Sequence, residues 1–178
     1  KSSNKNQNLK RNYEKAVNRL HSLGIMINGS FVFGLDYDDK DVFKRTVEWG
    51  VKNAITTSTY HILTPYPGTR LFRKMENDGR ILTRNWDLYD TRHVVYKSKN
   101  MTAKEIEDGY NWAYKEFYKW SNIFKASRNH DINKNKLKHF FYTAGWKKFE
   151  PFWNFVIKTK HLNNMTPVLE SILNNVRR

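Results

Sequence analysis

The residues with the clearest potential for chemistry lie where a β-compatible run ends in a rigid turn. His61 belongs to the run, and Pro65, Pro67 and Gly68 form the turn before the chain enters a helix. Proline presets the backbone φ angle and glycine permits the reversed one, so the turn is sharp. Rigid exits at the carboxyl ends of strands are where α/β proteins build ligand sites. The segment 60–69 is therefore the first candidate for the rim of a site, with a purely structural turn as the alternative.

Two histidines and a tyrosine near this turn are candidates for contact with a substrate. His61 and His93 could transfer protons, because imidazole titrates near neutral pH. A histidine beside an apolar strand is also a common structural group, and Tyr66 and Tyr89 could simply pack with a polar tip exposed. His61, Tyr66 and His93 are therefore candidates for facing a substrate, with structural roles as the alternative, and we assign no catalytic residue.

The absence of cysteine removes whole classes of chemistry. With no cysteine, the chain can form no disulfide, no zinc–thiolate site, no cysteine nucleophile and no ligand set for an iron–sulfur cluster. Aspartates cluster at residues 36–41, but their spacing fits no EF-hand calcium loop. Acidic residues also suit the start of a helix. We therefore predict a helix start there and no metal bound by this chain.

Charge and composition limit the class of protein. The chain has 32 Lys and Arg residues against 17 Asp and Glu, a net charge of +15. These basic residues are spread along the chain, which favours solvated helix faces over a nucleic-acid-binding patch. No apolar run approaches the ~20 residues that span a bilayer, and no signal-peptide pattern opens the chain, so we expect a cytoplasmic protein. The polar start at Lys1 suggests a piece of a longer protein.

The first part of the chain predicts a strand–helix–strand unit. An amphipathic helix over 7–23 precedes a strand at 25–34, a helix to about residue 53 and a second strand at 55–64. Two strands joined by a helix are expected to be parallel, with a right-handed crossover. Because a two-stranded parallel sheet is rarely stable alone, we expect this unit to belong to a larger sheet.

The first of these strands carries a candidate site on one face. Side chains alternate across a strand, so Asn28, Ser30 and Val32 share a face, which we expect to point inward. The free backbone groups of an edge strand are a template for pairing with another chain. We therefore expect the isolated chain to dimerise or aggregate through the strand at 25–34 unless another segment covers it.

The rest of the chain is predicted to be mainly helical. Thr102 and Glu105 form a capping-box pattern at the start of a long helix. The elements expected after the second strand are a helix from Thr69 to about Gly79, a turn at 86–90, a short strand at 93–96, a helix at 102–127, a polar linker at 127–134, and helices at 134–143, 147–160 and 165–176.

Several of these segments together resemble one enzyme superfamily. The chain resembles the carboxyl-terminal half of radical S-adenosylmethionine enzymes, in the Fe–S oxidoreductase-like subgroup with a cobalamin-binding domain, over roughly residues 1–165. The segments that carry the resemblance are 28–35, 61–69, 86–93 and 145–151. It implies an α/β fold, namely a fragment of a partial (βα)6 barrel with its last βαβ unit, followed by an all-helical extension. The implied domains are 1–98 and 99–178.

The resemblance also implies a wall for S-adenosylmethionine. Ser30, Val32 and Gly34 fall on the first three marked positions of a GxIxGxxE-like pattern that contacts adenine, while Tyr37 occupies the last. The implied cofactor-binding residues are Ser30, Val32, Gly34, Thr64 and Pro65, and the substrate-facing candidates are Asn28, His61, Tyr66 and His93. A core position for Val32 and a tight turn at Gly34 are the plainer alternatives.

The resemblance implies a function for the complete parent protein, but this chain lacks the cysteines that the function requires. The cysteines of the family's CxxxCxxC segment are absent, so we expect this chain to bind no cofactor alone and to be inactive alone. The complete parent would bind S-adenosylmethionine and a [4Fe–4S] cluster, with cobalamin as a further candidate. The chain would supply late barrel strands, part of the substrate wall and a helical cap.

Two other functions remain open from the sequence. One is a basic nucleic-acid-binding α+β module, and the other is a helical protein-interaction domain. The partners expected for the favoured function are the upstream part of the parent chain and an unknown small-molecule substrate, with no membrane span. An edge-strand dimer is a further expectation, and nucleic acid is a less favoured partner.

Overall fold

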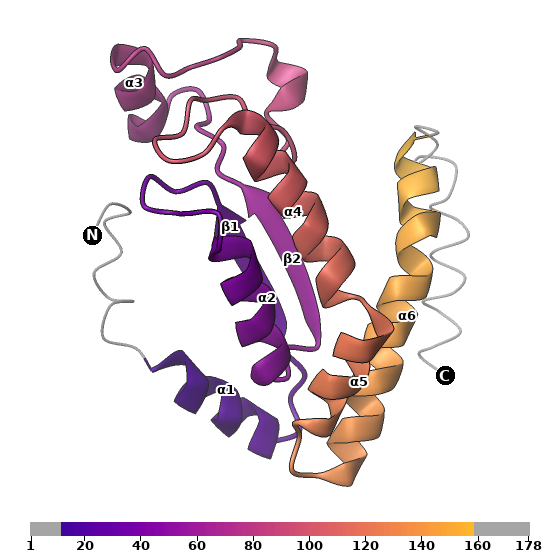
Figure 1. The fold of residues 1–178 in the computed structure, drawn as a ribbon. Coiled ribbons are helices and arrows are strands. Elements are labelled where there is room, and N and C mark those ends of the chain that lie inside the picture. The colour runs from indigo at the N-terminus through magenta and orange to yellow at the C-terminus, as the bar shows by residue number, and fades with distance from the viewer. Residues whose placement is uncertain (1–11, 159–178) are drawn as a thin grey trace. The chain divides into compact units, whose positions relative to one another are not determined.

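The computed structural model describes residues 12–158, which form two parallel strands and a set of helices (Figure 1). The chain divides into two compact units, Lys1–Thr143 and Ala144–Arg178, and the sheet belongs to the first. The predicted domain boundary at residue 98 stays a prediction. The elements are α1 (Tyr13–Ser22), β1 (Asn28–Phe33), α2 (Val42–Lys52), β2 (Thr57–Ile62), α3 (Arg70–Asn77), a 3-10 turn (Trp86–Leu88), α4 (Ala103–Phe117), α5 (Trp120–Arg128) and α6 (Asn133–Lys158).

Side-chain caps explain where several helices begin. The predicted capping box is confirmed: the Glu105 amide donates to Thr102 Oγ1 over 3.2 Å, and the Thr102 amide donates to Glu105 Oε2 over 2.8 Å. At α3, the Phe72 amide donates to Thr69 Oγ1 over 3.1 Å. Each bond satisfies an amide that the first turn of a helix leaves without a partner.

The two strands pair in parallel, as the strand–helix–strand pattern predicts. The register aligns Asn28 with Thr57 and continues in step to Phe33 opposite Ile62. Both strands are shorter than the predicted runs, because the residues at each end turn away into loops. The predicted strand at 93–96 is reduced to a single antiparallel bridge between Ile81 and Tyr96.

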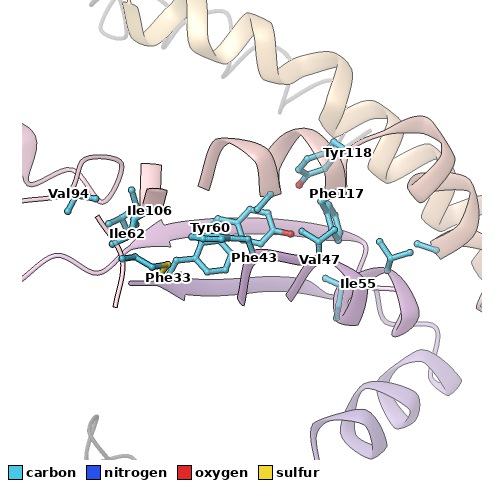
Figure 2. Packing of buried hydrophobic residues seen from close by; sticks show 14 of the residues in the cluster. Phe33, Phe43, Val47, Ile55, Tyr60, Ile62, Val94, Ile106, Phe117 and Tyr118 are labelled. Atoms are coloured by element: carbon cyan, nitrogen blue, oxygen red, sulfur yellow. The ribbon is translucent and has the colours of Figure 1, made fainter. Parts of the chain in front are cut away.

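The core lies between one face of the sheet and helices α2 and α4 (Figure 2). Tyr60 lies at its centre, stacked on Phe33 with ring centroids 5.3 Å apart and edge-on to Tyr114 at 5.1 Å. Phe43 of α2 packs edge-on against Phe33 at 4.7 Å. Aromatic pairs in these arrangements add to the stability gained from burying their area. The helices therefore cover the face that carries the largest side chains.

A close approach of α2 to α4 depends on Gly109. A Cβ atom at this position would collide with the ring of Phe43, which is only 5% exposed and held against Phe33. Gly109→Ala is expected to lower the free energy of unfolding by about 1–3 kcal/mol, because overpacking outweighs the better helix propensity of alanine. The measurement is urea unfolding followed by circular dichroism.

Gly145 provides the matched control for this prediction. It lies in α6, and a Cβ atom there would meet nothing within 4 Å. Gly145→Ala should leave the stability unchanged or raise it by up to ~1 kcal/mol. Equal effects of the two alanines would show that the approach of Phe43 to Gly109 does not constrain the fold.

The barrel fragment expected from the sequence is wrong for the part of the chain that is described. Residues 12–158 contain one two-stranded sheet with helices packed on one face, and this is a small α/β fold. A barrel wall curves until its own strands enclose the inner face. Here the face that carries Asn28, Ser30 and Val32, which was expected to point inward, is exposed instead. The aromatic rings of Phe31 and Phe33 direct the opposite face toward the helices.

Two helix boundaries also differ from the prediction. The long helix expected at 102–127 is two helices, because Lys119 adopts an extended backbone (φ −65°, ψ 136°) between α4 and α5. The helices expected at 134–143 and 147–160 are the single helix α6 as far as Lys158. The helix predicted at 165–176, and residues 7–11 of the first predicted helix, lie outside the described residues. None of the helices described is both long and apolar enough to cross a bilayer; a cytoplasmic location stays a prediction.

Candidate functional site: the open face of the sheet

The candidate site is the face of the sheet that no helix covers. We call it the open face. Its side chains are those of Asn28, Ser30, Val32, Thr57, Thr59 and His61. The parallel register aligns them in three pairs across the strands, Asn28 with Thr57, Ser30 with Thr59, and Val32 with His61. Parallel sheets are normally covered on both faces, so an exposed one is a surface on which something else can bind.

Exposure separates the two faces of β1 sharply. Val32 is 47% exposed, whereas its neighbour Phe33 is 1% exposed. The predicted alternation, with Asn28, Ser30 and Val32 on one face, is therefore confirmed, although that face points to solvent. Its amide and hydroxyl groups can donate and accept hydrogen bonds, while Val32 provides apolar surface.

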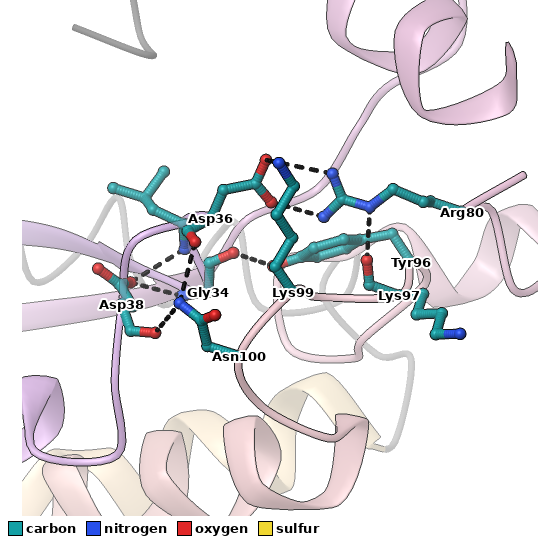
Figure 3. A network of polar contacts seen from close by, with 9 residues as sticks. Gly34, Asp36, Asp38, Arg80, Tyr96, Lys97, Lys99 and Asn100 are labelled. Atoms are coloured by element: carbon teal, nitrogen blue, oxygen red, sulfur yellow. Dashed lines mark hydrogen bonds and ion pairs between the residues drawn. The ribbon is translucent and has the colours of Figure 1, made fainter. Parts of the chain in front are cut away.

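The loop after β1 is closed on itself by hydrogen bonds (Figure 3). The amides of Gly34 and Leu35 each donate to Asp38 Oδ2 over 2.9 Å, and the Tyr96 hydroxyl donates to the Gly34 carbonyl. Burial raises the pKa of the Asp38 carboxyl despite these two amide bonds. Gly34 has a φ of +87°, which favours glycine. Its amide is already used by Asp38, so Gly34 shapes the rim and does not offer its N–H to a ligand.

A second set of contacts ties this loop to the segment after α3 (Figure 3). Arg80 donates to both carboxylate oxygens of Asp36, and its Nε donates to the Lys97 carbonyl over 2.7 Å. The hydrogen bond from Arg80, with added attraction from Lys99, holds the pKa of Asp36 below its usual value. Asn100 donates to the carbonyls of Asp36 and Asp38. The predicted helix-start role is therefore wrong for Asp36 and Asp38, which brace the loop.

The turn after β2 is largely a scaffold. Thr64 is 9% exposed and donates its hydroxyl to the Ile62 carbonyl over 3.0 Å, and Pro65 is buried. Tyr66 is 46% exposed, and its carbonyl accepts a hydrogen bond from Thr69 Oγ1 over 2.7 Å. Of the predicted residues in this turn, Tyr66 is thus the one whose side chain can reach a ligand.

His61 is held in place by a residue that the sequence did not single out. Its Nδ1 lies 3.2 Å from Thr91 Oγ1, and the Thr91 carbonyl accepts a hydrogen bond from the Ile62 amide over 2.7 Å. Thr91 has a φ of +66°, an uncommon conformation for a β-branched residue. Such backbone outliers persist where the surrounding structure enforces them, and they cluster at functional sites. Nothing in the local sequence signals this conformation.

His93 lies in the same segment but has a different partner. Its Nδ1 is 3.0 Å from both carboxylate oxygens of Asp90, and its side chain is half exposed. This carboxylate also accepts hydrogen bonds from the amides of Arg92 and His93. The structure therefore pairs His61 with Thr91 and His93 with Asp90, and among the described residues the two histidines are not hydrogen-bonded to each other.

The open face and its rim can bind a ligand on one side but offer no metal centre. Among residues 12–158, no group of three or more His, Asp or Glu side chains is arranged to hold a metal ion. The polar groups of the open face suit hydrogen bonding, and His61 is the titratable side chain on it. The arrangement favours binding and orienting an organic ligand, with a proton acceptor close by.

Comparison with known proteins gives methyltransferases as relatives. The chain is 32% identical over 151 residues to a bacteriochlorophyllide d C-12(1)-methyltransferase of Chlorobaculum tepidum, covering 85% of this chain and 33% of that protein. It is 27% identical over 136 residues to the bacteriochlorophyllide d C-8(2)-methyltransferase of the same organism, covering 76% of this chain and 30% of that protein. An uncharacterized methyltransferase of Pyrococcus horikoshii is 33% identical over 103 residues, or 58% of this chain and 22% of that protein.

The coverage of these relatives limits what they establish. The chain spans about a third or less of the length of the curated relatives that it matches. No protein-family model matches the chain. The activity of a whole relative therefore comes to this chain only as a proposal.

These findings correct the family and function that the sequence motifs suggested. The relatives are methyltransferases by name, so the assignment to radical S-adenosylmethionine, iron–sulfur oxidoreductases is replaced. Neither an iron–sulfur cluster nor cobalamin gains support from these names or from the ligand groups in residues 12–158. The nucleic-acid-binding and helical-interaction alternatives gain none either. The physical reason is that strand, glycine and proline-turn motifs report local geometry, which many α/β proteins share.

Proposed function

We propose that this chain forms one wall of the binding site of a methyltransferase that uses S-adenosylmethionine, and that the open face is that wall. The names of the relatives support the methyltransferase. We place the binding site on the open face because this face of the parallel sheet is uncovered and its polar side chains are aligned in register. Proteins normally cover both faces of such a sheet, and a ligand with its further wall would do so.

The open face suits S-adenosylmethionine in chemical kind. Ser30 and Thr59 carry hydroxyl groups that can bond the hydroxyls and carboxylate of the ligand. Val32, 47% exposed, offers apolar surface against which an adenine ring can lie. Ligand sites are concave and bury most of the ligand, so a flat wall needs a second wall opposite it. We therefore place Ser30 and Val32 in contact with the cofactor and assign its other contacts to residues outside the open face.

The residues of the rim hold this wall in shape. Gly34 is fixed by Asp38 and Tyr96, and Thr64 is fixed on the Ile62 carbonyl, so these residues support the cofactor site from behind. Pro65 is buried in the same turn. A rigid wall loses little conformational entropy when a ligand binds, so the entropic cost of binding is lower.

His61 is the residue that we propose to receive a proton. When bound, S-adenosylmethionine supplies the methyl group, and an acceptor that carries hydrogen releases a proton. In the tautomer whose Nδ1–H donates to Thr91 Oγ1, Nε2 carries no hydrogen. Nε2 has no hydrogen-bond partner among the described residues, so in this tautomer it can take that proton. Asn28, Tyr66 and His93 are the further residues that we propose to face the acceptor.

The test is binding of S-adenosylmethionine to the longest form of the protein that its gene encodes, with and without a charge on the open face. Val32→Glu is expected to weaken binding and slow methyl transfer, because the new carboxylate replaces apolar surface under the ligand. Leu82→Glu is the matched control, since Leu82 is 55% exposed and lies outside the open face. Unchanged binding by the Val32 variant would remove the open face from the site. A wild-type protein that does not bind S-adenosylmethionine would remove the proposed function.

A further inference from the structure

The two-stranded sheet has two outer edges, one along β1 and one along β2. The hydrogen bonds of β2 show which of its backbone groups point to β1 and which point to its outer edge. The Thr57 amide donates to the Ile27 carbonyl, and the Leu63 amide donates to the Phe33 carbonyl. Backbone N–H and C=O groups alternate in direction along a strand, so those of the odd-numbered residues of β2 point to β1. Those of its even-numbered residues, Ser58 and Tyr60 among them, point away toward the outer edge.

The outer edge of β2 is closed by Tyr114 of α4 and by Tyr118, the residue that follows this helix. The Ser58 amide donates to the Tyr118 hydroxyl over 2.9 Å, and that hydroxyl donates to the Ser58 carbonyl over 2.9 Å. Tyr114 repeats the arrangement one step on: its hydroxyl accepts from the Tyr60 amide over 3.2 Å and donates to the Tyr60 carbonyl over 3.5 Å. A phenolic hydroxyl can do both at once. With the Ile62 amide bonded to the Thr91 carbonyl, no room remains for another strand here.

The outer edge of β1 has the opposite character. Ile27 and Phe33 bond to β2, so by the same alternation the amides and carbonyls of Asn28, Ser30 and Val32 face away from the sheet. None of these backbone groups has a hydrogen-bond partner among the described residues. The row stops at Gly34, whose amide is bonded to Asp38 and whose carbonyl is bonded to Tyr96.

The sequence of β1 carries none of the usual protections of an edge. Natural edge strands are blunted by lysine, proline, bulges or a covering segment. From Asn28 to Val32 there is no charged residue and no proline, and the register with β2 runs without a bulge. An unprotected edge of this kind can pair with a further strand.

We propose that the edge of β1 from Asn28 to Val32 receives a β-strand from a part of the same protein that lies outside this chain. The chain spans a third or less of its relatives, which leaves ample sequence to supply that strand. Parallel sheets of two strands are too small to be stable units, which gives the added strand a reason to be there. The proposal rests on the two edges and on this coverage, and it stands whether or not the protein transfers methyl groups.

The surroundings of β1 define the kind of strand that fits. On the helix side, Phe31 lies edge-on to Trp49 with ring centroids 6.1 Å apart, and both are only partly buried. An incoming strand would place apolar side chains beside these rings. Its alternate side chains would lie beside Ser30 and extend the open face. The partner is therefore a strand of alternating apolar and polar residues, about five residues long, as strands commonly are.

Hydrogen exchange resolved at single amides tests this pairing. In the longest form of the protein, the amides of Asn28, Ser30 and Val32 are expected to exchange at least about 100-fold more slowly than in the 178-residue chain. The amides of Ser58 and Tyr60 serve as internal controls, because the tyrosines protect them in both forms.

Each outcome decides the proposal. Slow exchange at the three amides in the longer form, independent of protein concentration, supports it. Fast exchange there overturns it, and so does a gene product no longer than this chain. Protection that disappears on dilution would mean that a second copy, as in the expected edge dimer, occupies the edge, and it would also overturn the proposal. If the 178-residue chain does not fold alone, the protection measured in the longer form decides by itself.

Discussion

Tyr60→Ala is expected to lower the free energy of unfolding by about 4 kcal/mol, the largest loss from any single side chain of the sheet. Tyr60 is 1% exposed and touches four other aromatic rings, those of Phe31, Phe33, Tyr114 and Phe117. Its removal leaves a cavity between the sheet and α4 that the flanking backbone hydrogen bonds prevent from closing (Figure 2). Urea unfolding followed by tyrosine fluorescence and circular dichroism measures the loss.

Tyr66→Ala is the matched control for this substitution. Tyr66 lies just beyond the same strand, but its side chain is 46% exposed. Its removal should change the stability by no more than ~0.5 kcal/mol, as for most surface positions. If the two alanine variants unfold at the same urea concentration, the core is not organised around Tyr60.

Acid is expected to destabilise the protein through a buried pair of histidines. His130 Nε2 lies 3.0 Å from His139 Nδ1, both rings are almost fully buried, and the ring of His21 lies 4.5 Å from that of His130. Burial, with repulsion from the neighbouring histidines, lowers the pKa of His139 to about 3 and that of His130 to about 4. Asp131 opposes the shift at His130, and Lys136 adds to it.

The direction of the pH effect follows from where these protons bind. In the unfolded chain a histidine titrates near its ordinary pKa of 6.5, so between that value and about 4 the unfolded state binds more protons than the folded state. The free energy of unfolding therefore falls as the pH falls through this window. A shift of one pKa unit corresponds to 1.36 kcal/mol, so two histidines whose pKa values are both lowered by more than two units are expected to cost several kcal/mol between pH 7 and pH 4.

A double variant isolates this contribution from that of the carboxylates. His130→Gln with His139→Gln removes both titrating groups, so its stability should fall less steeply with acid than that of the wild type. Equal slopes for the wild type and the double variant, measured by urea unfolding at a series of pH values, would contradict the role given to the pair.

Local patterns in the sequence predict the local structure well. The alternation in β1, the capping box of Thr102 and Glu105 and the parallel strand–helix–strand unit all depend on residues close together in the chain, and all are observed. The direction of the face that carries Ser30 was wrong, because which side the helices cover is decided by packing between distant elements. The motifs that suggested a barrel report strand ends and turns, which do not fix the number of strands.

The features that the sequence did not predict depend on contacts across long stretches of chain. The hydroxyls of Tyr114 and Tyr118 reach β2 backbone groups 54 and 60 residues away. Nothing near Thr91 in the sequence marks its left-handed backbone or its contact with His61. Of the predicted site residues, Asn28, Ser30, Val32 and His61 share the open face, while Gly34, Thr64 and Pro65 hold its rim.

The affinity of the longest gene product for S-adenosylmethionine, compared between Val32→Glu and Leu82→Glu, shows whether the open face binds the methyl donor. If the open face is the wall of a methyl-donor site, the Val32 variant binds at least about tenfold more weakly, a loss of about 1.4 kcal/mol, while the Leu82 variant binds as the wild type does. Calorimetry gives both affinities, and circular dichroism confirms that both variants are folded. Equal affinities of the two folded variants would contradict the claim.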